Sequence, residues 1–197
     1  LGFEKNLITP STIIDDSPTN FRNYAPQNYD NKFHGKVSVR TALASSYNIP
    51  AVKILEKNGL ENFMEFAKKA GITSFTDPSR YGLSLTLGGG EVTMLDMATA
   101  YSIFPNGGQR VDLHPTLLAK NFRGQILEDY RLGQNLSKEN VISSKTAFLI
   151  SNILADNNAR TPAFGPGSAL VIPNQTVSVK TGTAQDKRDN WAIGYTP

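Results

Sequence analysis

The chain has 197 residues, of which 39% are hydrophobic and 19% are charged, and this describes one globular domain with a sizeable core rather than a disordered or fibrous chain. Its net charge is +3, but the basic residues are scattered singly or in pairs, so we expect no nucleic-acid partner. Cysteine is absent, which excludes disulfides and a cysteine nucleophile. His34 and His114 lack the spacing of metal ligands, so we interpret both as structural and expect neither a metal nor a cofactor.

The first quarter of the chain contains a coil followed by two predicted helices. Residues 1–35 are rich in proline, asparagine, aspartate and serine, which predicts extended, turn-rich coil with one short strand. A short helix is expected over residues 37–44 and another over residues 49–55. Between them lies Ser46-Tyr47-Asn48. A Ser-x-Asn in such a link is often only a helix cap, in which Asn48 would bond backbone N–H groups.

The middle of the chain is predicted to contain helices separated by glycine-rich turns. Residues 61–70 carry their apolar side chains on one stripe, which predicts an amphipathic helix. Residues 83–87 alternate leucine with polar residues and lead into three glycines at 88–90. We interpret this run as a flexible turn, because no phosphate-loop motif accompanies it. A broadly apolar helix is then expected over residues 94–103.

Short strands or coil are expected over residues 109–136, with a turn at residues 122–125. Residues 137–139 indicate the start of a helical region, and the apolar spacing predicts a helix over residues 144–154. Residues 157–174 contain several prolines and glycines, so we predict a loop that leads directly into the strand containing Lys180.

The strand that contains Lys180 is predicted over residues 177–184, which alternate valine with polar residues. It contains Lys180-Thr181-Gly182, and Gly182 would let a ligand or another backbone come close. After a polar turn over residues 186–190, residues 191–195 are expected to return as an antiparallel strand. On these residues alone, an ordinary hairpin with a solvated lysine is the simplest interpretation.

Two short motifs change that interpretation. Ser46-Tyr47-Asn48 and Lys180-Thr181-Gly182 are each the single match to their pattern in the chain, and in this order they are two of the three signatures of the penicillin-recognising serine acyltransferases. The chain as a whole resembles the transpeptidase domain of penicillin-binding proteins, most closely the class A bifunctional type and its 1C-like relatives. The resemblance extends over nearly the whole chain and rests on residues 9–18, 24–30, 46–52, 87–93, 156–160, 180–184 and 189–197.

The resemblance implies a mixed α/β fold with layered helices and strands, shared by penicillin-binding proteins and serine β-lactamases, in which helices flank an antiparallel sheet. Residues 1–197 would form a partial transpeptidase domain, truncated at both ends. The implied activity is D,D-transpeptidation in cell-wall synthesis, a serine acyl transfer on peptidoglycan stem peptides that end in D-Ala-D-Ala.

The resemblance also implies three catalytic residues. Ser46 would relay a proton to the leaving D-Ala amine, while Lys180 would hold Ser46 and add positive potential. Asn48 would hydrogen-bond the substrate amide. The third family signature, Ser-x-x-Lys, which would supply the nucleophile and its base, does not occur in the 197 residues. We therefore expect the nucleophile to lie upstream in a longer parent protein, and this piece alone to be inactive.

Substrate binding is implied for the strand itself. The hydroxyls of Thr181 and Thr183 would bind the terminal carboxylate, and Gly182 would leave room for a peptide along the strand edge. The expected partners are peptidoglycan stem peptides and β-lactam antibiotics. The parent is expected to be membrane-anchored and extracytoplasmic, in the periplasm or on the outer face of the cell membrane, and a glycosyltransferase domain is compatible with this class.

Two alternatives stay open at this point. A D,D-carboxypeptidase or β-lactamase would use the same fold with water as the acyl acceptor. A non-catalytic binding or sensor module would keep the peptide cleft without the nucleophile. The presence of Ser-x-x-Lys upstream would separate an enzyme from the non-catalytic module.

Overall fold

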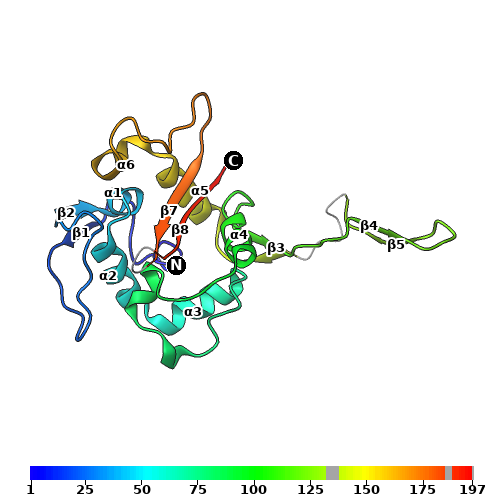
Figure 1. Cartoon of the computed structure of the whole chain (residues 1–197), viewed down its shortest axis with the longest axis horizontal. Coiled ribbons are helices and arrows are strands. Elements are labelled where there is room, and N and C mark those ends of the chain that lie inside the picture. Colours follow the sequence, from blue (N-terminus) through cyan, green and yellow to red (C-terminus); the bar gives the residue numbers. More distant parts are fainter. Residues whose placement is uncertain (132–137, 185–187, 197) are drawn as a thin grey trace.

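The computed structural model describes residues 1–131, 138–184 and 188–196 (Figure 1). These residues form helices and short antiparallel strands, which confirms the mixed α/β class. The α-helices are α1 (Val39–Ala44), α2 (Asn48–Asn58), α3 (Leu60–Lys69), α4 (Met94–Ser102), α5 (Ser144–Ala155) and α6 (Asn157–Phe164). Two 3-10 helices are η1 (Pro78–Arg80) and η2 (Leu83–Leu87). The strands are β1 (Ile13–Asp16), β2 (Gly35–Ser38), β3 (Gln109–Val111), β4 (Leu118–Lys120), β5 (Ile126–Asp129), β6 (Lys138–Asn140), β7 (Ser178–Thr183) and β8 (Asn190–Tyr195).

Within the described ranges, the strands pair as four two-stranded antiparallel sheets, β1–β2, β3–β6, β4–β5 and β7–β8. The β4–β5 hairpin projects away from the helical body, whereas β7 lies against α5 (Figure 1). The predicted final hairpin is confirmed, with Lys180 opposite Ile193 and Thr181 opposite Ala192. Residues 186 and 187 of its predicted turn lie outside the described residues.

The predicted helices around the Ser-x-Asn link are confirmed with small shifts. Residues 37 and 38 belong to β2, so α1 begins at Val39, and the Ser38 hydroxyl caps it by accepting the Thr41 N–H at 3.1 Å. The α2 helix ends at Gly59, whose φ of +83° suits glycine. The residues at 83–87 that alternate leucine with polar residues form the 3-10 helix η2.

Two predictions in the second half were wrong. Residues 138–140 form strand β6 instead of starting a helix, because they pair residue by residue with β3; residue 137 lies outside the described residues. Residues 157–164, predicted as loop, form helix α6. Asp156 caps this helix by accepting the Ala159 N–H at 2.9 Å, which stabilises a helix by about 0.5–2 kcal/mol. That cap favours α6 although Pro162 lies within it.

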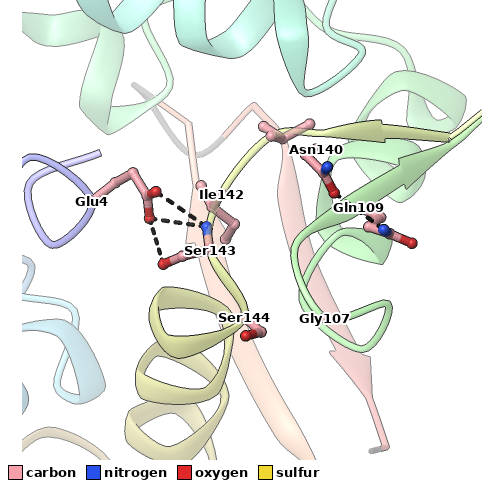
Figure 2. Close-up of a pocket in the computed structure, with 8 residues that line it drawn as sticks. Glu4, Gly107, Gln109, Asn140, Ile142, Ser143 and Ser144 are labelled. Carbon is pink, nitrogen blue, oxygen red and sulfur yellow. Dashed lines mark hydrogen bonds between the residues drawn. The ribbon is translucent and has the colours of Figure 1, made fainter.

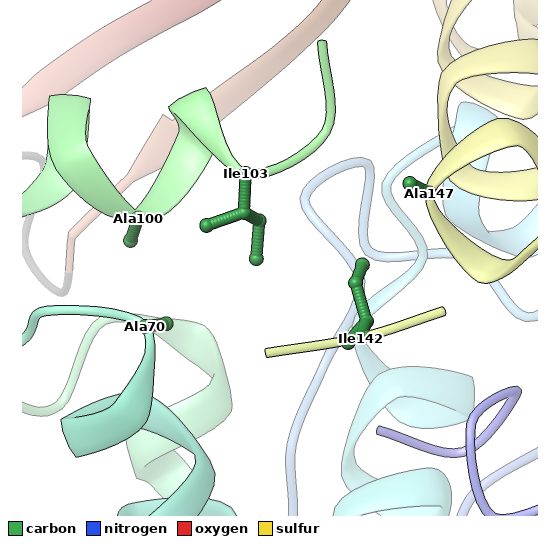
Figure 3. Packing of buried hydrophobic residues seen from close by; sticks show 5 residues of the cluster. All are labelled: Ala70, Ala100, Ile103, Ile142 and Ala147. Atoms are coloured by element: carbon green, nitrogen blue, oxygen red, sulfur yellow. The ribbon is translucent and has the colours of Figure 1, made fainter. Parts of the chain in front are cut away.

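Two clusters of buried apolar side chains hold the elements together. The first joins the α3 end, α4, the segment after β6 and α5 through Ala70, Ala100, Ile103, Ile142 and Ala147 (Figure 3). The second joins the N-terminal segment to α1 and α5 through Phe3, Val39, Ala44 and Ile153. Helix α5 contributes to both clusters and packs against both α1 and β7, so it supports these two elements together.

Candidate active site

The β7–β8 hairpin is placed by polar contacts with α5. Ser178 is 2% exposed, and its hydroxyl donates to the Ser151 carbonyl at 2.8 Å. On β8, the Tyr195 hydroxyl lies 3.0 Å from Ser151 Oγ, and its ring stacks on Phe104 with centroids 5.9 Å apart. These contacts fix the register of the hairpin against the helix and therefore the position of Lys180, two residues along β7 from Ser178.

The link between α1 and α2 is a Schellman motif. The Ser46 N–H donates to the Leu43 carbonyl at 3.2 Å, and the Tyr47 N–H donates to the Ala42 carbonyl at 2.9 Å. Ser46 occupies the left-handed position of this motif, with φ of +60°, where glycine is the usual residue. A side chain at such a position costs about 1–2 kcal/mol of backbone strain. The backbone conformation therefore does not explain why residue 46 is a serine, whereas the contact made by the serine hydroxyl does.

The Ser46 hydroxyl contacts Lys180 of strand β7. Lys180 Nζ donates to Ser46 Oγ at 2.5 Å and to the Thr181 carbonyl at 2.6 Å, so two residues 134 positions apart are in direct contact. Burial lowers the pKa of the Lys180 ammonium to about 8. The solvated lysine of an ordinary hairpin is therefore excluded. A lysine with this pKa, bonded to a hydroxyl, is suited to proton transfer near neutral pH.

Asn48 is the first residue of α2, and both of its nitrogens are held by the preceding coil. Its backbone N–H donates to Asn28 Oδ1 at 2.8 Å, and its Nδ2 donates to the Gln27 carbonyl at 2.7 Å. The alternative in which Asn48 caps the helix is wrong, because the N-cap is Tyr47, whose side chain makes no capping hydrogen bond. The Asn48 carboxamide is instead oriented by the Gln27 carbonyl, and the Asn48 backbone N–H is bonded by the Asn28 side chain.

The other strand residues lie along β7. Thr181 and Thr183 are two positions apart, so they share one face of the strand. Gly182 is exposed, and a Cβ built there would meet no other described atom within 4 Å. In the part of the chain that the structure describes, β7 pairs with β8 alone, so its second edge carries no strand. An extended peptide can add to such an edge.

A separate hollow, lined in part by Glu4 and Ser143, contains none of the predicted site residues (Figure 2). The Glu4 carboxylate accepts the Ser143 N–H at 3.1 Å and the Ser143 hydroxyl at 3.0 Å. These bonds give hydrogen-bond partners to polar groups at the N-terminal end of α5, so they assign Glu4 a structural role. Among the residues described, no cluster of histidine, aspartate and glutamate side chains could hold a metal ion.

The model of the penicillin binding protein transpeptidase domain matches residues 1–197. The chain belongs to this family. The chain is 33% identical over 199 residues to penicillin-binding protein 1C of Escherichia coli K12, a match that covers 98% of the chain and 23% of the relative. The resemblance to the transpeptidase domain of penicillin-binding proteins, stated from the sequence motifs, is confirmed. The chain spans about a quarter of the length of the curated relatives it matches.

Solved structures of other proteins share this fold. The D,D-transpeptidase domain of a peptidoglycan glycosyltransferase from Eggerthella lenta matches with a TM-score of 0.79 at 18% identity, covering 100% of this chain and 54% of that one. Penicillin-binding protein 3 of Mycobacterium tuberculosis, complexed with ampicillin, matches with a TM-score of 0.78 at 15% identity, covering 99% and 50%. None of the helices in the described ranges combines the length and the apolar character of a membrane span.

Sequence reasoning missed the residues that lie against the Ser-x-Asn link. Asp16 and Asn28 fall in a segment predicted as coil, yet they are 0% and 3% exposed. His34 stacks on Tyr47 with ring centroids 3.9 Å apart. The signal available was that residues 9–18 and 24–30 are among the stretches on which the family resemblance rests.

Proposed function

We propose that residues 1–197 form part of the transpeptidase domain of a peptidoglycan D,D-transpeptidase. The observation that carries this proposal is the 2.5 Å hydrogen bond from Lys180 Nζ to Ser46 Oγ, which joins the two signature motifs. Family membership over the whole chain and the likeness to a D,D-transpeptidase domain support it. The reaction would move the acyl group of one stem peptide from its terminal D-Ala to an amine on a second strand.

In the proposed first step, a serine hydroxyl attacks the carbonyl of the penultimate D-Ala and gives its proton to a base. The C–N bond to the terminal D-Ala then breaks, and the leaving amine takes a proton from Ser46 Oγ. The Lys180 ammonium re-supplies that proton through the hydrogen bond it already makes. A Ser-x-x-Lys motif does not occur among the 197 residues, so the nucleophilic serine would come from the rest of the parent protein, and this piece alone would be inactive.

The proposed substrate contacts use the remaining site residues. Asn48 would offer its carboxamide oxygen to an amide N–H of the peptide, while the bond from its Nδ2 to the Gln27 carbonyl holds the carboxamide in orientation. Thr181 and Thr183, on one face of β7, would bind the terminal carboxylate. Gly182 would allow the peptide backbone to approach, since no described atom occupies the space beside it.

The proposed partners are stem peptides and β-lactam antibiotics. The ampicillin complex of the similar Mycobacterium tuberculosis protein supports the second of these. Because stem peptides are cross-linked outside the cytoplasm, we place the parent protein on the outer side of the cell membrane, anchored to it. The glycosyltransferase named with the similar Eggerthella lenta domain supports a parent that also carries that activity.

Intact mass spectrometry of the full-length protein, with and without a penicillin, tests this function. We expect an increase by the mass of the drug. A folded protein that shows no increase would support the non-catalytic peptide-binding alternative instead. Incubation with a stem peptide and an amine acceptor then separates a transpeptidase, which gives a cross-linked product, from a carboxypeptidase, which gives the hydrolysed peptide.

The rate of acylation by a β-lactam is expected to fall as the pH rises above about 8, because Lys180 loses its proton with a pKa near that value. This pKa lies below the ordinary value of 10.5, so between the two values the unfolded chain binds more protons and the Lys180 contribution to stability rises with pH. Unfolding due to deprotonation of Lys180 therefore cannot explain a fall in the acylation rate above pH 8. The measurement is the acylation rate from pH 6.5 to 10, with melting temperatures in the same buffers. A rate that stays flat to pH 10 contradicts the role given to the ammonium.

A further inference from the structure

Beside Ser46-Tyr47-Asn48 lies a buried polar cluster, which we call the Asp16 network and define as Asp16, Asn28 and His34. The Asp16 carboxylate is 0% exposed. Its Oδ2 atom accepts three hydrogen bonds, from Asn28 Nδ2 at 2.7 Å, from the His34 N–H at 3.0 Å and from His34 Nδ1 at 2.8 Å. One carboxylate oxygen thus ties the end of β1 to the coil at residue 28 and to the residue before β2.

The network reaches the signature motif by two routes. Asn28 Oδ1 accepts the backbone N–H of Asn48 at 2.8 Å, while Asn28 Nδ2 is fixed by Asp16 and by the Lys32 carbonyl at 2.8 Å. The His34 ring stacks on Tyr47 at 3.9 Å with an interplanar angle of 12°. The middle and last residues of the motif are therefore both held by groups that Asp16 orients.

The burial of this network has a cost that ordinary packing does not explain. A buried carboxylate is expensive to desolvate, and Asp16 Oδ1 has no hydrogen-bond partner among the described residues. The buried carboxylate is retained close to Ser46, a strained residue with φ of +60°, which points to a role for the network in holding the signature motif.

We propose that the Asp16 network is a positioning device that holds Ser46-Tyr47-Asn48 in register with Lys180. This inference rests on the proposed acyl-transfer function, because the geometry it protects is the 2.5 Å contact between Ser46 and Lys180. Reacting groups displaced by about 1 Å can lose about 10²-fold in rate, so a network that touches no substrate can still control the chemistry.

The test compares Asn28→Ala with Asn58→Ala in the full-length protein. Asn58 is a matched control: it lies at the other end of α2, is 6% exposed, and donates its Nδ2 to the Ile54 carbonyl of its own helix at 2.7 Å. Asn28→Ala is expected to lower the second-order rate constant for penicillin acylation by about 10- to 100-fold. Asn58→Ala is expected to lower the melting temperature but to keep the rate within about 3-fold.

A pH profile separates positioning from simple loss of stability. Loosening the motif admits water beside Lys180, so Asn28→Ala is expected to move the alkaline fall in acylation to higher pH, whereas Asn58→Ala leaves it in place. Equal rates and profiles for the two variants would overturn the inference. If Asn28→Ala does not fold, His34→Phe keeps a ring against Tyr47 but loses the bond from the ring nitrogen to Asp16, and the same outcomes apply.

The failure of this inference is distinguishable from failure of the proposed function. A wild-type protein that is not acylated at all would defeat the acyl-transfer function. A wild-type protein that is acylated, with Asn28→Ala and His34→Phe acylated at the same rate and with the same pH profile, would defeat the positioning role alone.

Discussion

Lys180→Ala in the full-length protein is expected to lower the second-order rate constant for acylation by a β-lactam by about 10²- to 10⁴-fold, the range in which a positioned proton-transfer group contributes. Lys180 Nζ is 2.5 Å from Ser46 Oγ, so the variant removes both the proton source and the positive charge beside the cleft. Stopped-flow or mass-spectrometric acylation with a penicillin measures this rate.

Lys57→Ala is the matched control for this substitution. Lys57 is exposed and donates to the Leu7 carbonyl at 3.1 Å, so the variant makes the same charge change on α2 without touching β7. We expect its acylation rate to equal that of the wild type. Burial disfavours the Lys180 ammonium, so removing this charge should not by itself destabilise the fold. The melting temperature of Lys180→Ala is therefore expected to fall no further than for an ordinary side-chain truncation. An acylation rate within about 3-fold of the wild type in a folded Lys180→Ala variant would remove Lys180 from the mechanism.

The elements of this fold that could be predicted are those with a strong local pattern. The alternation in residues 177–184 and the return over residues 191–195 gave the hairpin and its pairing, because period-two burial has few other solutions. The helices α3, α4 and α5 followed from their apolar stripes. Helix α6 was missed because proline and glycine indicate a loop locally and outweighed the N-cap signal of Asp156, and because its packing on α1 is a tertiary feature that the local sequence does not show.

The site was predictable only in part, since its parts come from distant segments. Periodicity says nothing about a contact between Ser46 and Lys180, so the expectation came from the two motifs and the family resemblance. The left-handed conformation of Ser46 was not foreseeable either, because serine is not the residue that a Schellman motif favours. Asp16 and Asn28 lie in a turn-rich coil, and no local signal distinguishes a buried aspartate from an exposed one there.

Ser46→Gly is expected to separate the catalytic demand on this residue from the structural one. The variant removes the hydroxyl that contacts Lys180, so acylation by a β-lactam should fall by about 10²- to 10⁴-fold. Glycine also fits a φ of +60°, so the backbone strain that any L side chain creates there should disappear. Relative to Ser46→Ala, which lacks the hydroxyl but keeps the Cβ, the glycine variant should be more stable by about 1–2 kcal/mol.

Acylation kinetics and thermal unfolding of Ser46→Gly, Ser46→Ala and Ser46→Gly/Lys180→Ala together complete this prediction. The two single variants at residue 46 should be acylated equally slowly while differing in melting temperature. Because Ser46 and Lys180 act as one proton-transfer pair, the double variant should be acylated about as slowly as the slower single variant, rather than at the product of the two losses. Multiplicative losses would mean that the two residues act independently, and the 2.5 Å contact between them would then not be the route of the proton.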